Sequence, residues 1–192
     1  MSIDIGRRRG GIRLNNLSFE VTMNKDYLER SSDATAFKDQ LTGLYNRDFF
    51  FEEMERLEKG RRFPITVMVA DLDDLRIINA NLGQAAGDLL LQEASRLLQE
   101  VVRGEDVVAR IGADEFAILL PDTDAPSAAH VLERLRENEA IFNRETDGPR
   151  MAISLGVATV EEKGELKPVL LLADQRMLED KIARRARANG AS

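Results

Sequence analysis

The sequence contains no cysteine and only one histidine, His130. A chain without cysteine forms no disulfide and offers no thiolate to a metal, and this composition fits the reducing cytoplasm, where we expect the protein to reside. A single histidine argues against a histidine-rich zinc site and against a catalytic triad built on histidine. The residues around His130 are typical of a helix, so we interpret it as an ordinary surface side chain.

Long apolar runs and an excess of positive charge are also missing. No stretch approaches the ~20 apolar residues that span a bilayer, and the N-terminus has no apolar signal core. The formal net charge of −7 argues against a non-specific nucleic-acid binder, which is normally basic. A phosphate-bearing ligand would therefore need a local site built from a metal, backbone N–H groups and a few placed cations.

Length and composition favour one globular domain with a short extension, since 192 residues with 43% hydrophobic content can bury a sizeable core. We place the extension at residues 1–36, with a partly mobile basic start around Arg7–Arg9 and a helix near residues 24–38. An anchor for nucleic acid or a membrane is a second interpretation of this start, although four arginines are few. The domain is expected at residues 37–192.

Hydrophobic periodicity gives the expected elements of the domain. Helices are predicted at 47–59, 74–81, 88–102, 125–143 and 167–187, and strands at 65–70, 107–111, 116–120 and 150–160. Gly83 and Gly87 are expected to frame a loop. This order favours an α/β fold of the α+β type, with a mixed, antiparallel-rich central sheet flanked by helices.

Two acidic motifs follow apolar strands. The predicted hairpin turns through Gly112-Ala113-Asp114-Glu115, and Asp71-Leu72-Asp73-Asp74 follows the strand at 65–70. Adjacent carboxylates repel each other, and an apolar flank increases the repulsion, so a divalent cation would stabilise them. Taken singly, the first motif is more often a plain hairpin turn and the second more often a turn or a helix cap. Together they predict a carboxylate metal site that handles phosphates.

Further short motifs follow one another in a regular order. They are Asp-x-Leu-Thr-Gly-Leu-x-Asn-Arg at 39–47, Asp71-Leu72-Asp73, Asn79 with Gly83 and Gly87-Asp88, Arg103-x-x-Asp106, Arg110-Ile-Gly-Ala-Asp-Glu-Phe116, Ser154-Leu-Gly-Val-Ala158, and Ala173-Asp174 followed by Lys181 and Arg185. In this order and spacing the sequence resembles the GGDEF, or diguanylate cyclase, domain family from about Asp39 to about Ala186. The resemblance implies a nucleotidyl-cyclase or polymerase-palm type of fold.

The resemblance also implies an activity. Family members condense two GTP into cyclic di-GMP with release of two pyrophosphates, in a bacterial signalling role, and two subunits meet face to face with one GTP each. It implies that Asp71, Asp114 and the Leu72 carbonyl bind Mg²⁺ or Mn²⁺, which suits hard cations that take oxygen ligands. Glu115 is then the candidate for assisting deprotonation of the attacking 3′-hydroxyl.

The resemblance assigns further residues to GTP. The backbone N–H groups of Asp73, Asp74 and Leu75 begin a helix and can cradle the β- and γ-phosphates. The cations are Arg76, Lys181 and Arg185, and the last two lie four residues apart on one helix face. Asn79 and Asp88 match the positions that read guanine, because a carboxylate accepts from guanine N1–H and N2–H₂ together. Leu41 and Arg47 complete the substrate set.

A second site follows from the position of Arg103-x-x-Asp106, which has the family's spacing for an inhibitory site that binds the product. Arg134 or Arg136 would complete it from the neighbouring helix or subunit. The sequence departs from the family pattern at Ala113, where the signature usually has a second glycine, and at Gln84, Ala80 and Leu178. Ala113 keeps open an alternative, a degenerate domain that binds GTP or cyclic di-GMP and signals without catalysis.

Overall fold

The computed structural model describes residues 34–190, so most of the expected extension lies outside the described residues. Of the helix expected near 24–38, the described part is a short 3₁₀ helix, η1 (Ala34–Phe37), and Lys38 then bridges to Tyr45. The remaining elements are β1 (Tyr45–Asn46), α2 (Arg47–Lys59), β2 (Ile65–Leu72), α3 (Leu75–Leu82), α4 (Gln84–Glu100), β3 (Val107–Arg110), β4 (Glu115–Pro121), α5 (Ala125–Glu145), β5 (Ile153–Val160) and α6 (Leu166–Gly190).

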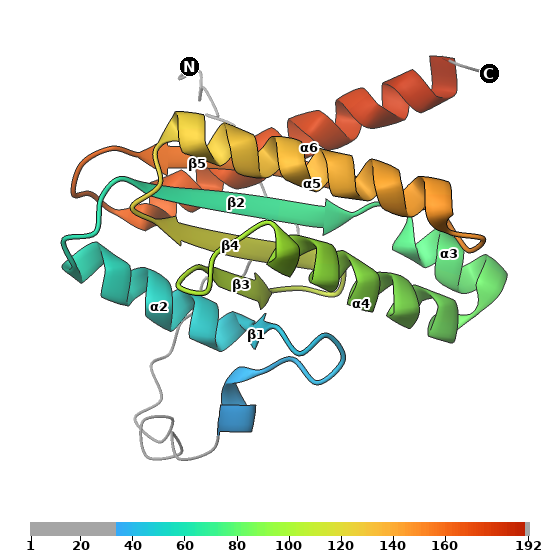
Figure 1. Ribbon diagram of the computed structural model, residues 1–192, viewed down its shortest axis with the longest axis horizontal. Helices are drawn as coiled ribbons and strands as arrows, with labels where there is room; N and C mark the ends of the chain where they lie inside the picture. Colours follow the sequence, from blue (N-terminus) through green and yellow to red (C-terminus); the bar gives the residue numbers. More distant parts are fainter. Residues whose placement is uncertain (1–33, 191–192) are drawn as a thin grey trace, which may run out of the picture. The chain divides into compact units, whose positions relative to one another are not determined.

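The strands form one five-stranded sheet in the order β1-β3-β4-β2-β5. Among the described strands, only β1 and β3 pair in parallel, and the other three pairings are antiparallel, which confirms the predicted mixed, antiparallel-rich sheet. In Figure 1 the helices α4 and α5 lie in front of the sheet and α6 lies behind it. The α+β class expected from the sequence is therefore confirmed.

Alternation along the central strand β2 sends its side chains to the two faces. Met68, Ala70 and Leu72 belong to a core shared with α4 and α5. Asp71 has the opposite parity, so its side chain lies on the face that packs on α6. All eight residues of β2 are buried, so the carboxylate of Asp71 lies near the end of a fully buried strand.

Local signals explain why several helices have the predicted bounds. The Asn46 side chain accepts from the N–H of Phe49 and caps α2, and Gly60 follows its last residue. Asp124 caps α5 by accepting from the N–H of Ser127.

Among the helices described, none is both long and apolar enough to cross a membrane.

One predicted feature is wrong, and one short strand was missed. Gly83 and Gly87 do not frame a loop, because α4 begins at Gln84 and Gly87 is buried inside it, so the helix expected at 88–102 starts and ends earlier. The two-residue strand β1 was not predicted, since two residues carry no periodicity.

Candidate active site

The two acidic motifs meet at one end of the sheet. Asp71 is the cross-strand partner of Glu115, and the N–H of Leu72 donates to the carbonyl oxygen of Asp114 at 2.9 Å. On the α6 side, Asp71 Oδ1 accepts from Lys181 Nζ at 2.6 Å. The structure thus brings together groups that the sequence presents in three separate motifs.

Burial and mutual repulsion disfavour the charged forms of the carboxyl groups at this end. Burial raises the pKa of Asp71, and repulsion from Asp114 adds to this, although the hydrogen bond from Lys181 opposes it. Burial also raises the pKa of Glu115 to about 7, with further repulsion from Asp114, Asp71 and Asp174. Such a cluster favours the approach of a cation.

The donor set fits a hard divalent cation. The N–H and C=O of one strand residue point to the same side of the strand, so the Leu72 carbonyl faces the turn that carries Asp114. Two carboxylates and a carbonyl are oxygen donors of the kind that Mg²⁺ and Mn²⁺ take, with substrate phosphates completing the shell. Within residues 34–190 no group of three or more His, Cys, Asp or Glu side chains is arranged as a metal site, and the expected set contains only two.

The expected phosphate cradle lies where β2 leads into α3. The Asp73 N–H already donates to the Ala152 carbonyl at 2.8 Å, which leaves the N–H groups of Asp74 and Leu75 for a phosphate. Asp74 has a positive φ of 59°, and its side chain does not cap α3. The first N–H groups of a helix have no intrahelical acceptor, so these two can bind an anion.

Three cations surround this cradle. Lys181 is bound to Asp71 and lies 3.6 Å from Asp73 Oδ1. Arg185 Nη2 lies 3.5 Å from Asp74 Oδ1, and both side chains are mostly exposed. Arg76 is exposed on α3. Lys181 therefore already neutralises a carboxylate, whereas the two arginines remain accessible to a triphosphate.

The residues expected to read guanine lie on the α3–α4 pair. Asn79 Oδ1 is buried and has no hydrogen-bond partner among residues 34–190. A Cβ at Gly87 would lie 1.9 Å from that oxygen, so glycine is needed for Asn79 to pack there. Asp88 follows Gly87 and is half-exposed, which places both predicted base-reading groups beside one another.

Leu41 and Arg47 have different surroundings. Leu41 packs against the core, and its carbonyl accepts from Gln92 Nε2 at 3.1 Å. Arg47 lies over the Phe51 ring at 5.5 Å, and its charge lowers the pKa of Glu115 against the larger effect of burial. Arg47 is thus near the carboxylates, whereas the contacts of Leu41 are those of a packing residue.

The predicted product site coincides with a cavity of about 310 Å³ between β1, the end of α4 and the turn before β3. Arg103 and Asp106 line it, and Asp106 Oδ1 is buried without a hydrogen-bond partner in the described part of the chain. Lys38 and Tyr45, which the sequence did not indicate, also line it, with Lys38 Nζ 3.6 Å from the ring centre. Arg134 instead donates to the Glu100 carbonyl and does not line the cavity.

Sequence reasoning missed several side chains at the carboxylate end. Asp174 of α6 is buried, its pKa is raised by burial and then by Asp71, and it also acts on Glu115. Ser154 Oγ donates to Asp73 Oδ2 at 2.7 Å. Both residues stand in motifs quoted above, and a buried acid on an otherwise apolar helix face is the signal that could have identified Asp174.

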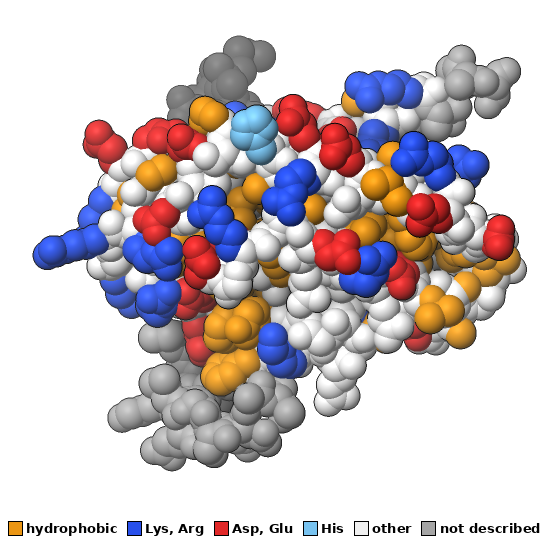
Figure 2. All heavy atoms as spheres, in the orientation of Figure 1, with side chains coloured by type: hydrophobic (Ala, Val, Ile, Leu, Met, Phe, Trp, Pro, Cys, Tyr) orange, Lys and Arg blue, Asp and Glu red, His pale blue; other side chains and the backbone are white. Residues whose placement is uncertain are grey.

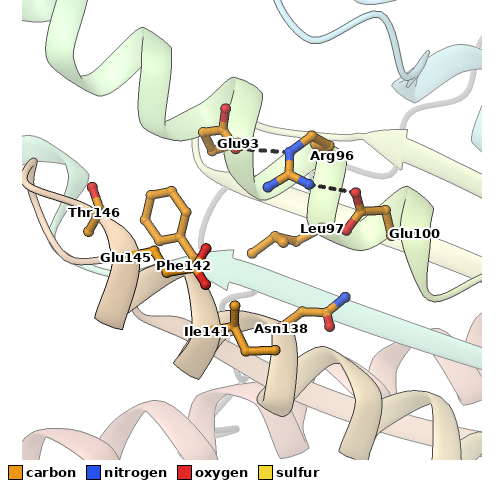
Figure 3. Close-up of a pocket in the computed structure, with 9 residues that line it drawn as sticks. All are labelled: Glu93, Arg96, Leu97, Glu100, Asn138, Ile141, Phe142, Glu145 and Thr146. Carbon is orange, nitrogen blue, oxygen red and sulfur yellow. Dashed lines mark hydrogen bonds and ion pairs between the residues drawn. The ribbon is translucent and has the colours of Figure 1, made fainter.

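A separate hollow of about 380 Å³ lies between α4 and α5 (Figure 3). Its floor includes Leu97 and Phe142, and its rim carries three glutamates, of which Glu93 and Glu100 hold Arg96 between them. The cation of this lining, Arg96, is already held by two glutamates, so the hollow offers little positive charge to a phosphate. Elsewhere on the face shown in Figure 2, positive and negative side chains are interspersed.

Comparisons with known proteins agree with this geometry. The family described as "Diguanylate cyclase, GGDEF domain" matches residues 36–187. The chain is 32% identical to the probable diguanylate cyclase DgcT of Escherichia coli (strain K12) over 155 residues, which cover 76% of this chain and 34% of that protein. It is 31% identical to the response regulator PleD of Caulobacter vibrioides over 173 residues, 83% of this chain and 38% of PleD. The chain thus spans well under half of these relatives.

Solved structures show the same fold. Diguanylate cyclase SiaD of Pseudomonas aeruginosa, in complex with its activator SiaC, has a TM-score of 0.71 at 25% identity, covering 82% of this chain and 63% of that one. The GGDEF domain of DgcB from Caulobacter crescentus, in complex with c-di-GMP, has a TM-score of 0.69 at 26% identity, covering 77% and 89%. The chain belongs to the GGDEF, or diguanylate cyclase, domain family.

Proposed function

We propose that the protein is an active, metal-dependent diguanylate cyclase that joins two GTP into cyclic di-GMP. One observation supports this proposal above the others. Asp71, Asp114 and Glu115 lie together at one end of the sheet, beside the first turn of α3 and the cations of α6. A cysteine-free chain that consumes GTP suits the cytoplasm.

Each half of the reaction replaces one phosphorus–oxygen bond by another. The 3′-oxygen of one GTP bonds to the α-phosphorus of the other, the bond from that phosphorus to pyrophosphate breaks, and the hydroxyl proton leaves to a base. A second such step closes the ring and releases the second pyrophosphate. Two domains face to face, each holding one GTP, place each 3′-hydroxyl near the other's α-phosphate.

The chain's own residues have distinct roles. The N–H groups of Asp74 and Leu75 hold the terminal phosphates, and Arg76, Lys181 and Arg185 add charge. Asn79 and Asp88 bind the guanine edge, and Glu115 is the proposed proton acceptor. Bound Mg²⁺ or Mn²⁺, held by Asp71, Asp114 and the Leu72 carbonyl, would stabilise the charge that develops on the phosphate oxygens.

Product inhibition is proposed at the cavity lined by Arg103 and Asp106. A bound guanine could donate to the unpartnered Asp106 Oδ1, and a phosphate could meet Arg103 and Lys38. At about 310 Å³ the cavity lies at the low end of ligand pockets, so it suits one guanylate unit of the product rather than the whole.

Incubation with GTP and Mg²⁺ or Mn²⁺, followed by chromatography, tests the activity. We expect cyclic di-GMP and pyrophosphate from the wild type and none from Asp114→Asn, which removes a charged ligand at constant volume. A binding domain without catalysis is the second candidate, since Ala113 departs from the family signature, although its backbone has no positive φ. Tight cyclic di-GMP binding without any product from the wild type would establish that alternative.

A further inference from the structure

A network of partly buried charges joins helices on opposite faces of the sheet. Glu139 of α5 is only 5% exposed. Its Oε2 accepts from Arg136 Nη1 at 2.9 Å, and its Oε1 accepts from the Ile153 N–H at 3.1 Å. Oε1 also accepts from Arg184 Nη2 of α6 at 2.5 Å. Because α5 and α6 cover opposite faces (Figure 1), this contact passes around the first residue of β5.

A second contact between the same helices lies one turn away. Arg136 Nη2 donates to Asp180 Oδ2 at 2.6 Å. The same Asp180 oxygen accepts from the Leu155 N–H at 2.9 Å. Helix α6 is therefore held at Asp180, which directly precedes Lys181, and at Arg184, in the turn that follows it.

The network reaches the candidate phosphate site through Asp73. Arg184 Nε lies 3.9 Å from Asp73 Oδ2, so Arg184 is shared between Asp73 and Glu139. Asp73 Oδ1 is buried without a hydrogen bond to any described residue, and Lys181 Nζ is 3.6 Å away. Arg184 and Lys181 thus approach the two oxygens of one carboxylate.

We propose that Glu139 is a positioning residue of the triphosphate site: by holding Arg184, it fixes the turn of α6 that presents Lys181 to the phosphates. The inference rests on the proposed function. Glu139 touches neither substrate nor reacting atoms, and it acts through Arg184.

The charge balance explains why the carboxylate matters. Glu139 and Asp180 together balance Arg136 and Arg184 within the network. Without the negative charge of Glu139, the nearest anion to Arg184 is Asp73, which already attracts Lys181. Arg184 would then move toward Asp73 and displace Lys181 from its present position. A purely structural pair would leave the site unchanged once the fold is intact.

The test uses 3′-deoxy-GTP, which carries the triphosphate and guanine but lacks the nucleophile, so binding is measured without turnover. We expect Glu139→Gln to weaken its binding about ten-fold, and Glu137→Gln, an exposed residue of the same helix, to leave it unchanged. Lys181→Met should weaken binding too. In the Lys181→Met background, Glu139→Gln should add less than about two-fold, because the two residues act through one contact.

Several outcomes separate this inference from the proposed function. If the wild type binds 3′-deoxy-GTP and Glu139→Gln binds it equally well, the positioning role is wrong and the cyclase proposal is unaffected. Full additivity of Glu139→Gln and Lys181→Met would also overturn it. A wild type that binds no GTP analogue overturns the proposed function itself. Should Glu139→Gln not fold, Arg184→Lys is the second variant, because it keeps the charge but loses the planar guanidinium that binds Glu139. Its effect on 3′-deoxy-GTP binding must likewise disappear in the Lys181→Met background.

Discussion

The two positions of the signature turn differ in what they tolerate. Among residues 34–190, the non-glycine residues with positive φ are Asp74 and Asp122, so Ala113 has an ordinary backbone conformation. Its side chain is exposed, and its carbonyl accepts from Arg110 Nη2 at 2.6 Å. At Gly112, by contrast, a Cβ would lie 2.5 Å from Glu115 Oε2. The glycine that matters for Glu115 is therefore the first one.

We expect Gly112→Ala to reduce cyclase activity about ten-fold or more, equivalent to ~1.4 kcal/mol in the barrier, with little change in the thermal midpoint. The reason is that the new methyl group displaces the flexible end of Glu115 and not the backbone. Ala113→Gly is the matched control and should stay within about two-fold of wild type. Wild-type turnover in Gly112→Ala would remove Glu115 from the mechanism.

Asp39 predicts a pH dependence of stability. Its Oδ1 accepts from the N–H and the hydroxyl of Thr42 at 2.9 and 2.7 Å, and Arg110 lies 3.3 Å away. Burial raises the pKa of Asp39, but these hydrogen bonds and the Arg110 charge outweigh it, so the pKa is lowered on folding. The stabilisation is therefore present above the unfolded pKa of about 3.9, and it is lost as the pH falls through the lower folded value.

Asp39→Asn should lower the free energy of unfolding by about 1 kcal/mol at pH 7. The difference from wild type should shrink as the pH falls below about 4, because the native carboxylate then becomes protonated. Urea unfolding across this range measures both, with the exposed Asp147→Asn as control. A difference that stays constant down to pH 3 would contradict the assigned pKa direction.

At the scale of elements, the sequence predicted those whose signals are local. The helix at 47–59 has the bounds of α2, because Asn46 caps it and Gly60 follows it. The predicted loop at 83–87 is wrong because Gly87 is not a turn residue. Gly87 instead allows close packing inside α4, since a Cβ there would meet Asn79.

The contacts around Glu139 lay beyond sequence reasoning for a different reason. Its partner Arg184 is 45 residues away and belongs to another helix. From the sequence alone, Arg184 is equally consistent with a solvated basic helix end. Only the packing of α5 and α6 around β5 brings Arg184 into contact with the buried Glu139.

The backbones of two elements approach each other closely at Gly156 of β5. An ideal Cβ there would lie 1.9 Å from the Ala173 carbonyl oxygen and 2.3 Å from the Met177 nitrogen. Both are backbone atoms of α6, so Gly156→Ala must push the helix away from the sheet. We expect a loss of at least about 2–3 kcal/mol in the free energy of unfolding.

Gly164→Ala is the control, because its nearest neighbour is a Val160 methyl at 3.5 Å, an ordinary contact. Urea unfolding of the two variants compares them directly. Because α6 also carries Lys181 and Arg185, the Gly156 variant should bind GTP less well even where it remains folded. Equal stability of the two variants would mean that β5 and α6 are not in close contact.

At the scale of the whole molecule, the two proposed nucleotide sites lie toward opposite ends of α4. Asp88 lies in the first turns of α4, and Arg103 lies shortly beyond its last residue, Glu100. A helix of 17 residues is about 25 Å long, so one product molecule cannot occupy both sites of one domain. The proposed product inhibition would therefore act through the second copy or through the helix itself.

We expect Arg103→Ala to abolish cyclic di-GMP binding and Lys38→Met to weaken it about ten-fold, because each removes a cation from the cavity. Burial lowers the pKa of Lys38, and a bound anion nearby would raise this pKa again. Calorimetric titration with cyclic di-GMP measures this, with the exposed Lys163→Met as control. Both cavity variants should bind 3′-deoxy-GTP like the wild type, and a parallel loss of GTP binding would refute the separation of the two sites.

In the proposed reaction, two domains act as a face-to-face pair. Cyclic di-GMP contains two new phosphodiester bonds, and each domain of a face-to-face pair would supply the groups for one of them. A pair with one Asp71→Asn domain should therefore make at most one bond and release a linear dinucleotide. With a nine-fold excess of Asp71→Asn, only about a tenth of wild-type domains pair with each other under free exchange, so cyclic product per wild-type domain should fall about ten-fold. The same excess of an unrelated protein should have no effect. Chromatography distinguishes the linear from the cyclic product, and undiminished cyclic di-GMP in the mixture would show that a single domain completes both steps.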